Sequence, residues 1–208
     1  MMSKVILTFC GVVIGVVIGW FAHATFELRT RYALSSDLQQ IARLHSSTVD
    51  VVLQHSVSEK GTNQLPLDFK ARCIGLGYLS RATLVALDAR KFRLRRLRTL
   101  PENESIRTIL LESMDSFSES FRLSMEMYEQ LEKDEDADVM ELQWRAADAR
   151  ARANAQMRSI LNAFRSAPER AAYLQIMEDR TKSETIDWTL PNQRRQQAEQ
   201  PKSQGASR

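Results

Sequence analysis

The apolar stretch Val5–Phe26 limits the folds open to this chain more than any other feature. It contains no Asp, Glu, Lys or Arg. As a helix rising ~1.5 Å per residue it would reach ~33 Å, about the thickness of the hydrocarbon core of a bilayer. Trp20 lies late in the stretch, where aromatic residues of membrane helices meet the interface. The pattern predicts a single transmembrane helix over residues 5–26, after a short N-terminal flank at 1–4.

A cleavable signal peptide is the competing interpretation of the same stretch. Ala22, His23 and Ala24 fit the small-x-small pattern of a cleavage site after an apolar core. The apolar core before that site is long for a signal peptide, and the bulky His23 stands within the site itself. The length favours an anchor, and a secreted protein released after Ala24 is the alternative.

Glycines recur at every fourth residue within the apolar stretch, in the run GVVIGVVIG. Gly11, Gly15 and Gly19 therefore share one face of a helix and form a flat groove along it. A groove of this kind lets a second helix backbone approach closely. We expect the chain to form a homo-oligomer through these three glycines, although glycine is also common in membrane helices that do not associate.

The charges that flank the apolar stretch predict the location of the rest of the chain only weakly. Lys4 precedes the stretch, and Arg29 and Arg31 follow it. Because Lys and Arg are enriched on the cytoplasmic side, the count slightly favours a cytoplasmic body, with a periplasmic body as the alternative. The predicted location is a single-pass protein of a cell membrane, with the bacterial inner membrane as the favoured one.

The rest of the sequence predicts an all-α fold. The chain has 208 residues but only 7 Gly and 5 Pro, and Leu, Ala, Arg, Glu and Met are abundant. Long helical patterns joined by short turns favour an antiparallel up-down bundle over residues 27–188, with four long helices and a shorter fifth. A Gln-rich segment at 189–208 predicts a disordered polar tail. The expected helices are 27–59, 67–100, 103–131, 139–164 and 166–186.

Two of these helices carry clear apolar seams at spacings of three and four residues. We expect these seams to form the core of the bundle. The seam of the third helix is Ile106, Leu110, Met114, Phe117, Phe121, Met125 and Tyr128. The seam of the fourth is Val139, Leu142, Ala146, Ala149, Ala153, Met157, Ile160 and Phe164.

A basic run at residues 90–98 lies near the end of the second predicted helix. If that helix folds back along the first, the run lies close to the membrane, and the acidic turn at 132–138 lies at the far end. Lipid headgroups would then attract these cations by ~1 kcal/mol each. A solvated helix face is the alternative interpretation. The predicted headgroup contacts are Arg29, Arg31, Lys91, Arg93, Arg95, Arg96 and Arg98.

The sequence contains no recognisable catalytic or metal-binding motif. It has no HExxH, CxxC, phosphate-binding loop or nucleophile elbow. His45 and His55 are ten residues apart, which is ~15 Å along a helix and too far for a local metal site. Cys73 has no neighbouring histidine in the sequence and is expected to be a buried small hydrophobe. We therefore predict no catalytic residue, no cofactor and no metal.

These observations favour a non-enzymatic, membrane-tethered helical bundle that acts as an interaction or assembly protein. Its expected partners are membrane lipid, a second copy of itself and an unidentified protein. The net charge of +3 is too small to indicate nucleic acid. The alternative is a periplasmic bundle, anchored in the inner membrane, that senses a ligand or envelope stress.

Overall fold

The computed structural model describes the backbone of residues 2–165 and the side chains of residues 13–164. Within these residues the fold is entirely helical, with no strand. The helices are α1 (Met2–Gln64), α2 (Phe69–Arg96), α3 (Pro101–Lys133) and α4 (Met140–Arg165). The predicted all-α fold with four long helices is confirmed. The predicted fifth helix at 166–186 and the polar tail at 189–208 lie outside the described residues.

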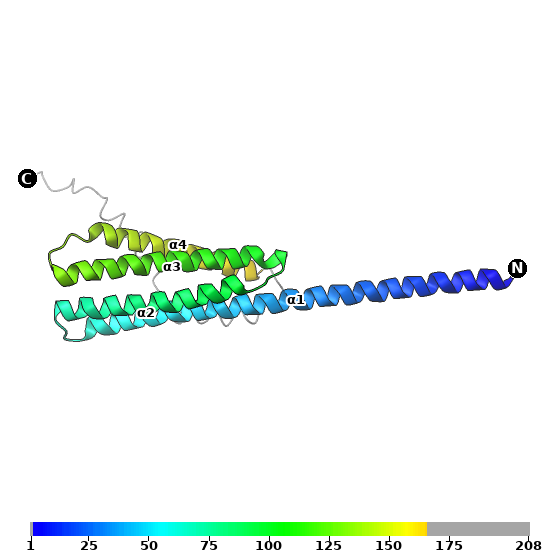
Figure 1. The fold of residues 1–208 in the computed structure, drawn as a ribbon, viewed down its shortest axis with the longest axis horizontal. Helices are drawn as coiled ribbons and strands as arrows, with labels where there is room; N and C mark the ends of the chain where they lie inside the picture. Colours follow the sequence, from blue (N-terminus) through cyan, green and yellow to red (C-terminus); the bar gives the residue numbers. More distant parts are fainter. Residues whose placement is uncertain (1, 166–208) are drawn as a thin grey trace, which may run out of the picture.

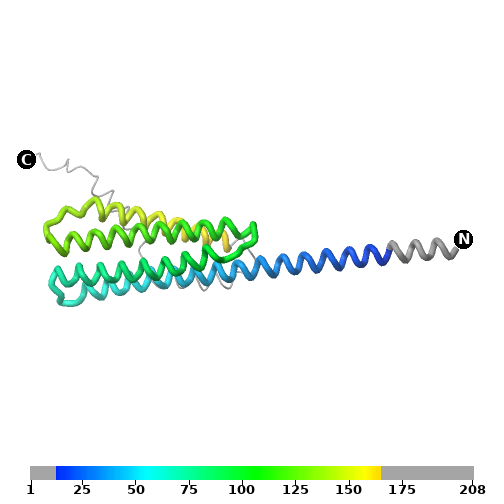
Figure 2. The backbone as a smooth tube through the Cα atoms, viewed as in Figure 1, coloured from blue at the N-terminus to red at the C-terminus, as the bar shows by residue number. Residues whose placement is uncertain are grey.

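The N-terminal half of α1 projects from the bundle, and its second half packs against the other helices (Figure 1). The turns after α1 and α3 lie at one end of the bundle, and the turn after α2 lies at the end from which α1 projects (Figure 2). At that end the backbone N–H of Leu100 donates to Asp37 Oδ2 over 2.6 Å. The chain therefore returns along α2 to the level where α1 enters the bundle.

Local sequence signals set the helix boundaries. Asp68 caps α2 by accepting a hydrogen bond from the backbone N–H of Ala71 over 2.6 Å. Pro101 is the first residue of α3, where its missing N–H costs nothing. The acidic residues Glu102 and Glu104 follow in the first turn, which suits the positive end of the helix dipole.

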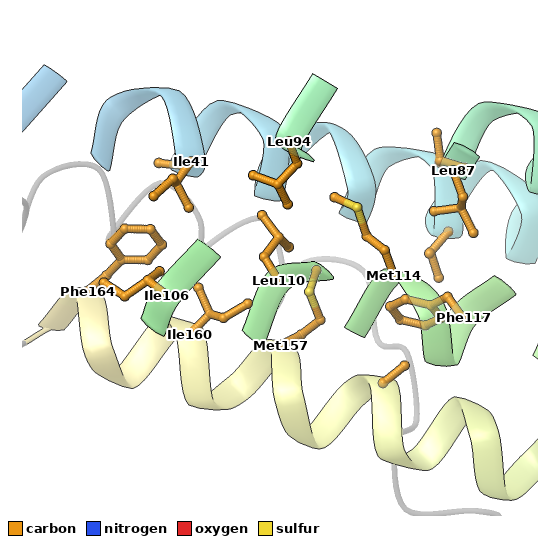
Figure 3. Packing of buried hydrophobic residues seen from close by; sticks show 14 of the residues in the cluster. Ile41, Leu87, Leu94, Ile106, Leu110, Met114, Phe117, Met157, Ile160 and Phe164 are labelled. Atoms are coloured by element: carbon orange, nitrogen blue, oxygen red, sulfur yellow. The ribbon is translucent and has the colours of Figure 1, made fainter. Parts of the chain in front are cut away.

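The apolar seams predicted for α3 and α4 form the core. Five of the seven α3 positions and six of the eight α4 positions are buried, namely Ile106, Leu110, Met114, Phe117 and Phe121 on α3 and Ala146, Ala149, Ala153, Met157, Ile160 and Phe164 on α4. Ile41 from α1 and Leu87 and Leu94 from α2 face these side chains (Figure 3). Because α3 contacts each of the other three helices, it is the centre of the bundle.

The predicted transmembrane helix over 5–26 is not supported. Among the residues that the structure describes, no helix has a segment long and apolar enough to cross a membrane. Beyond Phe26 α1 continues without interruption through the charged Glu27, Arg29 and Arg31. The predicted single-pass location in a cell membrane, favoured as the bacterial inner membrane, is therefore wrong.

We predict that Asp37→Ala lowers the free energy of unfolding by about 1–3 kcal/mol, because the partly buried α2–α3 turn loses a charge-assisted hydrogen bond. Urea denaturation followed by circular dichroism measures the change. Gln39→Ala, two residues away on the exposed surface of α1, is the control and should change stability by under about 0.5 kcal/mol. Equal losses in the two variants would contradict the role given to Asp37.

Candidate functional site

The projecting part of α1 exposes an unusual amount of apolar side chain. Helix surfaces that face water are normally polar, and large exposed apolar patches usually mark interaction sites. Of the described helices, none packs against this part of α1 (Figure 1). Its exposed large hydrophobic residues are Val13, Ile14, Val16, Val17, Ile18, Trp20, Phe21, Phe26, Leu28 and Tyr32. We call residues 13–32 the projecting segment.

The glycine groove predicted from the sequence lies within the projecting segment. A Cβ atom added at Gly15 or Gly19 would meet nothing within 4 Å. No contact with the described residues therefore requires glycine at these two positions. Gly11 precedes the residues whose side-chain surroundings the structure describes. The open groove leaves the prediction of helix association untested.

The basic residues predicted to contact lipid headgroups differ in their exposure. Arg29, Arg31, Arg93, Arg95, Arg96 and Arg98 are exposed. Lys91 is buried, and its Nζ lies 2.7 Å from Asp88 Oδ1 and 3.3 Å from Asp115 Oδ1. Its ammonium group therefore joins α2 to α3 and is not available to a partner. The remaining contacts with lipid headgroups were predicted from the transmembrane helix, and they lose that basis.

A cluster of polar side chains lies inside the bundle, and the sequence analysis missed it. His55 Nε2 lies 3.4 Å from Ser80 Oγ, and His55 Nδ1 lies 3.8 Å from Glu59 Oε2. The Tyr128 hydroxyl donates to Glu59 Oε1 over 3.3 Å. The His55 ring also contacts the Phe121 ring in a tilted arrangement, with a centroid distance of 4.4 Å. Helices α1, α2 and α3 each supply a polar member, which sequence spacing within one helix cannot reveal.

Burial controls the protonation of this cluster. It lowers the pKa of His55 to about 4, and the positive charge of Arg150 on α4 acts in the same direction. Burial also raises the pKa of the Tyr128 hydroxyl, and the neighbouring carboxylate of Glu59 adds to that rise. His55 is therefore neutral at pH 7, and Tyr128 keeps its proton.

The order Ser80, His55, Glu59 resembles a nucleophile, a base and an orienting carboxylate, but the geometry does not favour catalysis. Ser80 is 0% exposed, so a substrate cannot reach its hydroxyl. The distance of 3.8 Å from His55 to Glu59 is too long for an orienting hydrogen bond. The better interpretation is a buried polar layer that packs the helices in one register.

A second buried histidine lies ten residues earlier on α1. His45 is 2% exposed, and among the described residues neither ring nitrogen has a partner with hydrogen-bonding geometry. Burial lowers the pKa of His45 to about 4, against a smaller opposing effect of the Met157 backbone on α4. Because a buried charge without a partner is costly, this ring must remain neutral in the folded bundle.

A shallow groove of about 260 Å³ lies between α2 and α3 near the acidic end of the bundle. It is lined by Cys73, Ile74, Gly77, Tyr78, Arg81, Glu129 and Glu132. Cys73 is buried, as predicted from the sequence, and burial raises the pKa of its thiol. A thiol with a raised pKa forms little of the reactive thiolate. The groove therefore offers no activated nucleophile.

Among the described side chains, no group of three or more His, Cys, Asp or Glu residues is placed to hold a metal ion. No family profile, curated protein or solved structure shows significant similarity to this chain. The projecting segment is therefore the candidate site that the structure supports most directly.

Proposed function

We propose that this chain is a non-catalytic interaction or assembly protein, in which the bundle is a rigid body and the projecting segment binds a second copy. The observation that carries the proposal is the exposure of ten large apolar side chains on a part of α1 that none of the other described helices covers. Apolar surface of this extent favours association, because each buried Å² contributes about 25 cal/mol.

The glycine groove supports pairing with an identical helix. Two copies can bring Gly11, Gly15 and Gly19 together, and the absence of side chains there lets the backbones approach closely. A two-fold axis along the pair would place each residue opposite the same residue of the second copy. In this parallel arrangement both bundles leave the pair at the same end.

We predict that a cysteine on the groove face cross-links two full-length chains. Ala22 lies on the face of Gly15 and Gly19, and Ala24 lies on the opposite face. In a background of Cys10→Ser and Cys73→Ala, Ala22→Cys should form a disulfide-linked dimer under mild oxidation. Ala24→Cys, with the same chemistry on the other face, should form at least about fivefold less of it, as gels without reductant would show.

A bulky side chain in the groove should abolish this cross-link. Gly15→Ile, added to Ala22→Cys, should reduce the linked fraction to the level of Ala24→Cys. Val17→Phe adds bulk on the opposite face and should leave the cross-link unchanged. Equal cross-linking at the two faces, or no effect of Gly15→Ile, would reject the proposed pairing.

A ligand-sensing bundle has weaker support. The groove beside Cys73 is smaller than the roughly 300–1,000 Å³ of most small-molecule sites, and it is open to solvent. The interior polar cluster around His55 is closed to solvent at Ser80. We therefore favour the assembly function over ligand sensing.

A further inference from the structure

Helix α2 carries two apolar faces on opposite sides. Its inner face packs into the core through residues such as Leu76, Thr83, Leu87 and Leu94. The outer face carries a second seam at spacings of four and three residues, formed by Tyr78, Ala82, Val85, Ala89 and Phe92, all of them exposed. Tyr78 is 68% exposed, Val85 67% and Phe92 54%. We call these five residues the outer seam.

The outer face of the neighbouring helix α3 is polar instead. The exposed positions along the middle of α3 are Thr108, Glu112, Asp115, Arg122 and Glu126, all polar. A helix on the surface of a monomer normally has one apolar stripe, directed to the core. A second stripe at heptad spacing is typical of a helix that packs against another helix on its free side.

We propose that the outer seam of α2 binds the outer seam of a second copy, with the two α2 helices antiparallel and Val85 at the two-fold axis. This arrangement places Tyr78 of each copy beside Phe92 of the other, so that the two large aromatic residues share the ends of the interface. The small residues Ala82 and Ala89 then lie near the centre, where they allow the helices to approach closely.

The charges beside the seam favour the antiparallel arrangement. Arg81 and Asp88 lie on the same flank of α2, seven residues apart, and both are exposed. Within the chain Arg81 also pairs with Glu129 over 3.5 Å and Asp88 with Lys91 over 2.7 Å, and the exposed sides of both groups remain open to a second copy. In an antiparallel pair centred on Val85, Arg81 of each copy lies next to Asp88 of the other, which forms two opposite-charge pairs. A parallel pair would instead align identical charges at each level, and it would place the arginines at 93, 95 and 96 of both copies together.

This surface is distinct from the one in the proposed function. A parallel pair formed through the projecting segments carries its two α2 helices parallel to each other, since α2 runs antiparallel to α1 in each chain (Figure 1). It therefore cannot bring Val85 to Val85 in an antiparallel contact. A chain with both surfaces links on each side to a different copy, and the result is an extended assembly.

The interface is short. The outer seam spans fourteen residue steps from Tyr78 to Phe92, or about 21 Å of helix. A contact of this size is below that of most stable dimers, so we expect micromolar affinity for the isolated pair.

Cysteine cross-linking of the full-length chain tests the arrangement. In the background of Cys10→Ser and Cys73→Ala, Val85→Cys should give a disulfide-linked dimer, because its two copies meet at the axis. Tyr78→Cys should not, because in the antiparallel pair its two copies lie about 21 Å apart. Thr108→Cys, on the polar outer face of α3, is the matched control and should not cross-link either.

Charge exchange gives a second readout. Arg81→Asp in the Val85→Cys chain should reduce the cross-linked fraction severalfold, and the double change Arg81→Asp with Asp88→Arg should restore it. Because Asp88 also pairs with Lys91, both variants are compared at unchanged helical circular dichroism and unfolding midpoint. Gly15→Ile should leave the fraction unchanged, which separates this interface from that of the projecting segment. Stronger cross-linking through Tyr78→Cys than through Val85→Cys, or a double variant that stays as weak as Arg81→Asp, would overturn the proposal.

Discussion

Mild acid is expected to destabilise this bundle by about 4 kcal/mol between about pH 7 and pH 5, through His45 and His55 together. Each ring is 2% exposed, and burial lowers the pKa of each to about 4. In the unfolded chain a histidine has a pKa of about 6.5. The unfolded state therefore takes up protons as the pH falls below about 6.5, and the folded state takes them up only near pH 4.

The direction of this effect follows from proton binding. Stability is full above the unfolded pKa, and it is lost as the pH falls from about 6.5 towards 4, because only the unfolded state gains protons in this window. Each histidine contributes about 2 kcal/mol of the loss by pH 5. Urea denaturation at a series of pH values measures the effect as a falling free energy of unfolding.

Replacing the histidines should flatten the pH dependence. His45→Leu keeps the site filled and removes its titration, so the loss between about pH 7 and pH 5 should shrink by about 2 kcal/mol. His55→Leu should do the same, although Ser80 then loses its side-chain neighbour. His23→Leu, on the exposed projecting segment, is the control. A pH dependence that persists in the double variant His45→Leu with His55→Leu would contradict the prediction.

Phe117→Ala is expected to cost about 3–5 kcal/mol of stability, the usual loss for truncation of a fully buried phenylalanine. Phe117 is 1% exposed, and its ring stacks on Phe121 with a centroid distance of 6.4 Å. The cost combines the lost burial with the cavity that the rigid neighbours leave behind. Guanidinium denaturation at neutral pH gives the difference directly.

An exposed phenylalanine provides the matched comparison. Phe69 begins α2 and is 40% exposed, so Phe69→Ala removes the same atoms from a site that is already partly in water. We expect a loss of under about 1 kcal/mol. Similar losses at the two positions would show that α3 is not the tightly packed centre of the bundle.

Apolar periodicity identified the core of α3 and α4 from the sequence, because a helix can bury only one side against its neighbours and the spacing of three and four marks that side. Phe117, Phe121, Ile160 and Phe164 are buried as that pattern predicts. Periodicity was less useful for α2, since its apolar residues occupy two opposite faces and the pattern does not say which one is covered.

The apolar stretch at the start of the chain shows a different limit. Its lack of charged residues predicts a membrane helix, yet no described helix is long and apolar enough to cross a membrane. A run of apolar residues indicates only that the helix surface it forms is shielded from water, whether by lipid or by protein.

By itself the sequence determined the all-α class, the four long helices and the buried seams of α3 and α4, since these depend on propensity, capping and spacing within one segment. Only the tertiary structure brought His55, Ser80 and Tyr128 into one cluster, because they come from three helices and are joined by no local spacing. It also decided that Lys91 lies between two carboxylates and that the outer seam of α2 faces away from the core. Which side of a helix is covered depends on the neighbours that pack against it, and those neighbours are set by the assembled bundle.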